Sequence, residues 1–226
     1  ECFRLWKACD AQVGDDFHIN PEEIETKYYG VLTKIFNVAR FASQFESPDD
    51  LSSPPELNIE DIWILSEFDR SMAKVEKAWK DVDIYTAAQT LKSFGTGIFP
   101  SHWLEMSKSR LYDGDISATW TIHRIVRDFL SAFSPICPFF THYLSTTLYG
   151  SSSVDVRAFP RLPSFHGSEL FEELRVKTES LEEFNSMVWR EKKERGLSLK
   201  SPISDIQIPE FLNLFTDALV NMHNLE

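Results

Sequence analysis

Apolar side chains recur every three or four residues along most of this chain, the spacing that places them on one face of an α-helix. The clearest stripe reads Ile62, Leu65, Phe68, Met72, Val75, Trp79 and Val82. A second stripe begins after Asn20, which we expect to cap a helix with Pro21 at the first helical position and Glu23 completing a capping box. The pattern predicts amphipathic helices that bury one face in a common core.

Six helical segments are predicted before residue 150. They cover Glu1–Ala11, Pro21 to about Phe45, Asn58 to Val82, Asp83–Tyr112, Ser117–Phe133 and Pro138–Tyr149. The fourth contains Gly95, Gly97 and Pro100, so we expect a kink or a short break there. Turn-forming residues separate the second segment from the third between Ser47 and Pro55.

The pattern changes after Gly150. Short apolar runs at Val154–Phe159 and Ile203–Ile208 predict two strands, with a helix over Ser168–Arg195 between them and a last helix over Pro209–His223. The expected fold is therefore mainly α. Residues 1–150 would form an antiparallel helical bundle, and residues 151–226 a small C-terminal α/β subdomain.

Composition narrows the possible functions. No apolar run approaches the roughly 20 residues that a membrane span needs, so we expect a soluble chain with no membrane partner. Cys2, Cys9 and Cys137 have the wrong number and spacing for a disulfide framework or a structural zinc site. The formal net charge of −12 opposes general attraction to nucleic acid, so any such binding must rest on local basic patches.

One candidate binding face lies near the end of the second predicted helix. Asn37 and Phe41 follow Lys34 by one and two turns, and Arg40 lies beside Asn37. Arginine binds phosphates or base edges, asparagine reads base edges, and an exposed aromatic ring offers a plane for stacking an unpaired base. The alternative is a solvated helix face with Phe41 folded against the adjoining loop.

A second candidate is a run of basic residues near the C-terminus. Its members are Arg190, Lys192, Lys193, Arg195 and Lys200. Cations of this kind on a mobile helix suit contact with phosphates, without reading sequence. Glu191 and Glu194 interrupt the run, so a salt-bridged surface helix is the alternative.

Three local motifs carry a resemblance to a known family. They are Phe3-Arg-Leu-Trp6, Asn37-x-x-Arg40-Phe41, and Gly196-Leu-Ser-Leu-Lys-Ser-Pro202. Together with the order of the segments, they resemble the region of class Ia aminoacyl-tRNA synthetases where the helical anticodon-binding domain follows the catalytic domain. Within the valine, isoleucine and leucine group, the chain is most similar to the archaeal kind of valyl-tRNA synthetase. The isoleucyl enzymes come second and the leucyl enzymes third.

The resemblance implies a tRNA-binding role. The parent enzyme would be a valine-tRNA ligase that uses ATP and magnesium. This chain begins within an apparent helix and without methionine, and is expected to be an excised C-terminal piece with no catalytic residue, metal ligand or cofactor of its own. Its implied partners are a tRNA anticodon stem-loop and the catalytic domain of the same polypeptide. We expect a monomer in the cytoplasm.

The segment Glu105-Met-Ser-Lys-Ser109 is similar to the family's Lys-Met-Ser-Lys-Ser loop, which stabilises the phosphates of ATP. Here Glu105 replaces the first lysine and the flanking pattern is helical, so we interpret the match as coincidence. The companion His-Ile-Gly-His motif is absent. A different class of function, a helical module that docks a protein partner, would also fit the acidic composition. Binding to RNA should weaken steeply with salt, whereas docking of a protein need not.

Overall fold

The computed structural model describes residues 1–10, 14, 16, 19–150, 159–160, 162 and 169–226. Its α-helices are α1 (Cys2–Cys9), α2 (Pro21–Ala42), α3 (Ile59–Lys80), α4 (Ile84–Thr96), α5 (Leu104–Tyr112), α6 (Ile116–Phe133), α7 (Pro138–Tyr149), α8 (Glu169–Arg175), α9 (Thr178–Glu194) and α10 (Thr216–His223). A π-helical turn, η1 (Phe99–Trp103), precedes α5, and a 3₁₀ helix, η2 (Glu210–Phe215), precedes α10. The prediction of a mainly helical bundle is confirmed.

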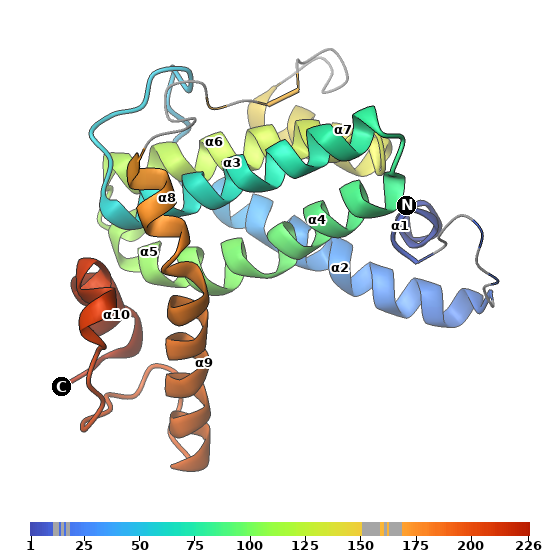
Figure 1. The fold of residues 1–226 in the computed structure, drawn as a ribbon. Coiled ribbons are helices and arrows are strands. Elements are labelled where there is room, and N and C mark those ends of the chain that lie inside the picture. The colour runs from blue at the N-terminus through green and yellow to red at the C-terminus, as the bar shows by residue number, and fades with distance from the viewer. Residues whose placement is uncertain (11–13, 15, 17–18, 151–158, 161, 163–168) are drawn as a thin grey trace.

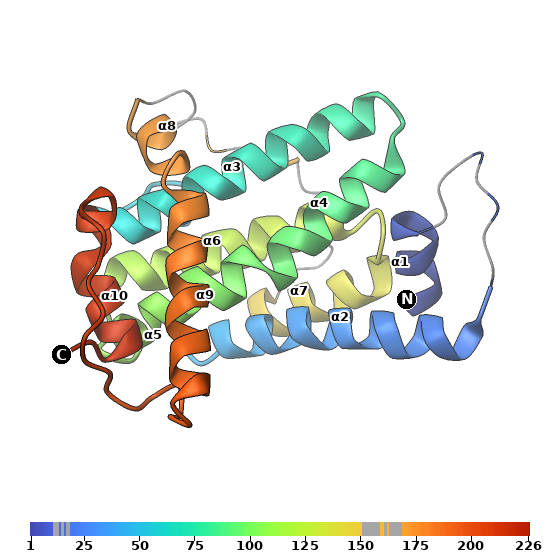
Figure 2. The same ribbon diagram turned by 60° about the horizontal axis from the view of Figure 1, so that its bottom comes forward.

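The long helices α2, α3, α4 and α6 lie side by side along the length of the molecule, as Figures 1 and 2 show. Helix α9 crosses this bundle at a steep angle near one end, and α10 lies beside it (Figure 1). The N-terminus lies at the opposite end from the C-terminus in both views.

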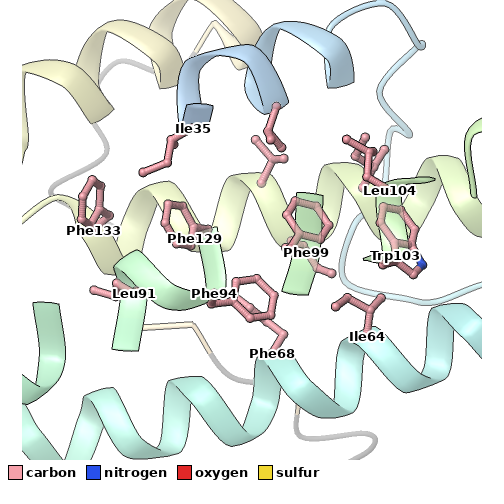
Figure 3. Close-up of a cluster of buried hydrophobic side chains, with 14 of the residues drawn as sticks. Ile35, Ile64, Phe68, Leu91, Phe94, Phe99, Trp103, Leu104, Phe129 and Phe133 are labelled. Carbon is pink, nitrogen blue, oxygen red and sulfur yellow. The ribbon is translucent and has the colours of Figure 1, made fainter. Parts of the chain in front are cut away.

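Large aromatic side chains fill the centre of the bundle (Figure 3). The rings of Phe94 and Phe99 stack with centroids 5.6 Å apart, and Trp103 stacks on Phe99 at 5.3 Å. Gly95 allows α4 to approach α6 closely, because a Cβ atom there would lie 2.7 Å from the Cζ atom of Phe129. The apolar stripes read from the sequence therefore meet in one core.

The predicted break between residues 83 and 112 is confirmed. Helix α4 ends at Thr96, and Gly97 follows with φ −109° and ψ −104°. A Cβ atom at Gly97 would lie 2.6 Å from the backbone oxygen of Ser93, so a larger residue does not fit this bend. Pro100 has no backbone N–H, and the chain passes through the π-helical turn before α5 begins.

A buried carboxylate, Asp61, joins three parts of the bundle. It accepts hydrogen bonds from the indole of Trp103 at 2.9 Å and from the hydroxyl of Ser117 at 2.5 Å. The guanidinium of Arg110 pairs with Asp61 and also with Asp115, which caps the start of α6. A buried charge is tolerated only when paired and hydrogen-bonded, and this one fixes α3, α5 and α6 relative to each other.

Polar contacts dock the C-terminal segments onto α3. Arg175 at the end of α8 donates to the backbone oxygen of Ser66 at 2.9 Å and pairs with Asp69 at 3.1 Å. Thr178 at the start of α9 donates to buried Glu67 at 2.7 Å and accepts from the indole of Trp63 at 3.0 Å. The division at residue 150 stays a prediction, but residues on both sides of it share these buried bonds.

Several predicted elements differ from the structure. In place of the expected strand at Ile203–Ile208, the structure has a single parallel bridge from Ile203 to Leu225, followed by a bend at Asp205, whose φ is 68°. Of the other expected strand, only Phe159 lies within the described residues. The single helix expected over Ser168–Arg195 is two helices, α8 and α9, and the last helix begins with a 3₁₀ turn. An α/β character of the C-terminal part is therefore not seen in the described segments.

Two further expectations concern single residues. Val82 was assigned to the buried stripe of α3, but it follows the end of that helix with φ 59° and a side chain that is 79% exposed. The three cysteines are free thiols, and burial raises the pKa of Cys9 to about 11.

Within the described part of the chain, no helix combines the length and the apolar character that crossing a bilayer requires.

Candidate nucleic-acid interface

The last two turns of α2 carry polar groups that face solvent. The helix starts at Pro21, where Asn20 accepts a hydrogen bond from the backbone N–H of Glu23, and its buried face runs through Ile35, Val38 and Ala42. Asn37 and Arg40 lie on the opposite side and are exposed. Their side chains form no hydrogen bond or ion pair with the described residues, so both are available to a ligand.

Lys34 is less available than the other members of this face. Its ammonium donates to the backbone oxygen of Thr96, the last residue of α4. This bond satisfies a carbonyl that the end of a helix leaves unpaired and fixes the lysine against α4. The sequence places Lys34 beside Asn37 on α2, but the structure assigns its ammonium a structural partner.

Phe41 does not present an open ring. It is half-buried and packs against Phe45 with ring centroids 5.1 Å apart and an interplanar angle of 73°. Tyr112, the last residue of α5, contacts both rings, at 6.0 Å from Phe41 and 5.8 Å from Phe45. Phe41 thus packs against Phe45, just beyond the end of α2, and against Tyr112, and is not freely exposed. Tyr112 was not among the residues predicted to bind RNA, and its only local signal in the sequence is an aromatic residue just before Asp113-Gly114.

The basic run near the C-terminus is partly exposed. Arg190, Lys193 and Lys200 project into solvent at the end of α9 and in the turn that follows it. Arg195 pairs with Glu191 at 2.9 Å, as expected for a salt-bridged helix surface. Figure 1 shows this end of α9 projecting away from the bundle, so the structure does not bring this run together with the end of α2.

Lys192, predicted to contact phosphates, has its ammonium directed into the protein in the structure. Its side chain is fully buried, and its ammonium donates to the backbone oxygens of Leu199 at 2.8 Å, Ser201 at 2.8 Å and His223 at 2.7 Å. Burial lowers its pKa from the ordinary value. Three N–H groups meet three carbonyls, so this lysine holds α9, the following turn and α10 together.

The residues of the Glu105–Ser109 segment do not fit a nucleotide site. They lie within α5, Ser107 is buried, and Lys108 is paired with Glu105 at 2.5 Å. A phosphate would have to displace this pair beside a carboxylate of like charge. In the part of the chain that the structure describes, no group of three or more His, Cys, Asp or Glu side chains is arranged to hold a metal ion.

Comparison with known proteins identifies the family of this chain. Residues 61–208 match the model of the family described as the anticodon-binding domain of tRNA ligase. The valine–tRNA ligase of Saccharolobus solfataricus is 33% identical over 86% of this chain and 23% of its own length. That of Aeropyrum pernix is 32% identical over 92% and 26%, and that of Nanoarchaeum equitans 28% identical over 100% and 28%.

This chain thus spans about a quarter of the length of the relatives it matches. The family match covers the bundle from α3 onward together with α8 and α9, and the relatives extend the similarity over α2 and the candidate face at its end. The chain belongs to the anticodon-binding domain family of tRNA ligases.

Proposed function

We propose that this chain binds the anticodon stem-loop of tRNA-Val as part of a valyl-tRNA synthetase. The relatives it resembles are named valine–tRNA ligases, and its family is defined by anticodon binding. In this proposal the whole enzyme joins valine to tRNA with ATP and magnesium, elsewhere in the polypeptide. It acts as a monomer in the cytoplasm, and this chain contributes no catalytic group.

The observation that carries the proposal is the end of α2. Arg40 and Asn37 expose polar groups that have no side-chain partner among the described residues, on the last turns of a helix whose other face is fixed in the core. Next to them lies the ring cluster of Phe41, Phe45 and Tyr112. Unpaired RNA bases are recognised by hydrogen bonds to their edges combined with stacking on aromatic rings. Both chemistries are adjacent here.

The exposed cations at the end of α9 would contribute to tRNA affinity in a different way, through charge. Arg190, Lys193 and Lys200 lie on a part of the molecule that projects from the bundle. Contacts from such residues to phosphates hold a tRNA in register without reading its sequence. They also provide local attraction in a chain whose net charge is −12.

A binding titration with Arg40 variants tests the proposal. We expect the wild-type chain to bind a tRNA-Val transcript in low salt, and Arg40→Ala to weaken binding by about ten- to a hundred-fold, the loss of one or two charge-assisted hydrogen bonds. Arg40→Lys should recover only part of the affinity, because lysine keeps the charge but not the planar fork. Circular dichroism and thermal unfolding verify that the exposed substitutions leave the fold intact.

The proposal fails if the folded wild-type chain shows no salt-sensitive affinity for tRNA, or if Arg40→Ala binds as tightly as wild type. Salt-insensitive association with a protein, in place of RNA binding, would instead favour a protein-docking module.

A further inference from the structure

The three rings at the end of α2 are not equally accessible. Phe41 and Phe45 are half-buried and pack against the core, whereas the side chain of Tyr112 is 65% exposed. The three interplanar angles are 73°, 86° and 66°, so each ring meets its neighbours edge to face. Tyr112 is therefore the ring of this cluster that a ligand can reach most easily.

The backbone that carries Tyr112 is firmly held. Two residues earlier, the guanidinium of Arg110 pairs with Glu60, Asp61 and Asp115. On the other side, the backbone N–H of Asp115 donates to the backbone oxygen of Arg110 at 3.0 Å, closing the turn between α5 and α6. With the backbone held, only the side-chain torsions of Tyr112 remain to be ordered when a ligand stacks on its ring.

The charges around the ring favour a base over a phosphate. Arg40 precedes Phe41 on the last turn of α2, but exposed Asp113 directly follows Tyr112 and Glu46 directly follows Phe45. Carboxylates at these positions oppose a phosphate, whereas they do not oppose the neutral face of a nucleobase. Stacking on an aromatic ring is the contact that every unpaired base can make.

We propose that Tyr112 is the surface on which an unpaired base of the tRNA anticodon loop stacks, with Phe41 and Phe45 supporting it from behind. This inference rests on the proposed function and reassigns the stacking role from Phe41 to a residue on a different helix. Tyr112 and Arg40 then form two sides of one base-binding site, built from the ends of α5 and α2.

The test separates stacking from packing. The 226-residue chain and its variants are titrated with an anticodon stem-loop RNA that carries 2-aminopurine in the loop, whose fluorescence is quenched by stacking. Tyr112→Phe should bind like wild type, because the ring is kept. Tyr112→Leu keeps apolar cover over Phe41 and Phe45 but removes the plane, and should weaken binding about five- to a hundred-fold and reduce the quenching.

Tyr29→Leu is the matched control, because Tyr29 is also 65% exposed and lies on α2 well before the candidate face. It should leave both affinity and quenching unchanged. Binding that is equal for wild type and Tyr112→Leu would overturn the role of Tyr112 and leave the anticodon-binding proposal standing. Failure of the wild-type chain to bind either the stem-loop or tRNA-Val would overturn both. Thermal unfolding verifies that Tyr112→Leu remains folded.

Discussion

At the scale of single residues, Lys192 and Lys193 are neighbours with opposite roles. The ammonium of Lys192 is buried against three backbone oxygens, whereas the side chain of Lys193 projects into solvent. Replacing Lys192 with methionine keeps most of the apolar stem but leaves those carbonyls without a donor. Since an unpaired buried polar group costs about 1–3 kcal/mol, we expect Lys192→Met to lower the free energy of unfolding by roughly 2–5 kcal/mol.

The adjacent Lys193→Met is the matched control and should change stability by no more than about 0.5 kcal/mol, because an exposed side chain leaves nothing unpaired. Urea or thermal unfolding measures both variants. Equal unfolding free energies for the two would contradict the assignment of Lys192 as the link between α9 and α10. A loss of tRNA affinity in Lys192→Met without a loss of stability would return Lys192 to the binding surface.

The sequence contained a signal for this burial, although the basic run concealed it. The buried residues Leu181, Asn185, Val188 and Lys192 follow one another at three or four positions, which is the apolar stripe of α9. A lysine on such a stripe is buried only if it meets several acceptors, and these come from the turn after α9 and from α10. That convergence is a tertiary property that local pattern does not specify.

At the scale of elements, the projecting end of α9 is expected to act through charge alone. The double reversal Lys193→Glu with Lys200→Glu should weaken binding of cognate and non-cognate tRNA by similar factors. It should also reduce the slope of log affinity against log salt by about one for each lost phosphate contact. Filter binding over a series of salt concentrations measures both quantities.

The double reversal Lys74→Glu with Lys77→Glu is the control, because it changes the net charge by the same amount. Both lysines are exposed on the later part of α3, away from α9's projecting end (Figure 2). If both double variants flatten the salt slope equally, the effect belongs to the overall charge of the chain and not to α9.

Helix boundaries set by local chemistry were predictable. Asn20 and Pro21 specify the start of α2, and α7 begins at Pro138 and ends at Tyr149 as the sequence indicates. The break between α8 and α9 was not predictable, because residues 176 and 177 include neither glycine nor proline. It is imposed by bonds to α3, from Arg175 to the backbone oxygen of Ser66 and from Thr178 to Glu67.

The strand predicted at Ile203–Ile208 was wrong for a related reason. Its apolar positions match a strand, but the only bridge in the described segments pairs Ile203 with Leu225. The sequence pattern predicts that Ile203 is buried, as it is, but does not predict which residues pack over it. The same holds for the candidate site. Residues 37 to 41 could be predicted from the pattern of a single helix, whereas Tyr112 joins the site only through contacts between helices.

At the scale of the whole molecule, three buried side chains joined by hydrogen bonds connect the bundle to the C-terminal helices. The amide nitrogen of Asn185 donates to the Nδ1 atom of His102 at 3.0 Å, and its oxygen accepts from the Nε2 atom of His223 at 2.7 Å. These residues lie on η1, α9 and α10. The orientation of α9 and α10 relative to the bundle depends on these hydrogen bonds. The position of the basic end of α9 therefore depends on them too.

This arrangement makes the stability of the fold dependent on pH. Burial lowers the pKa of His102 to about 4, and burial together with the nearby charge of Lys192 and the ring of His102 lowers the pKa of His223 to about 4. The ordinary value is 6.5, so between pH 4 and 6.5 the unfolded chain binds more protons than the folded one. Stability from neutral histidines is therefore fully present above about pH 6.5 and is lost as the pH falls towards 4.

We expect the free energy of unfolding to fall between pH 7 and pH 5 by roughly 2 kcal/mol for each of the two histidines. Protonated His102 would point a hydrogen at the amide N–H of Asn185, and among the described residues Glu182, 3.9 Å from its Nε2 atom, offers a partly compensating charge. The variant His223→Gln can still donate to Asn185 and does not titrate. Its unfolding free energy, measured by urea denaturation, should depend about half as steeply on pH over this window, whereas His142→Gln, at an exposed position on α7, should follow wild type. An unchanged pH dependence in His223→Gln would mean that the acid sensitivity arises elsewhere and that the junction between the bundle and α10 is indifferent to protonation.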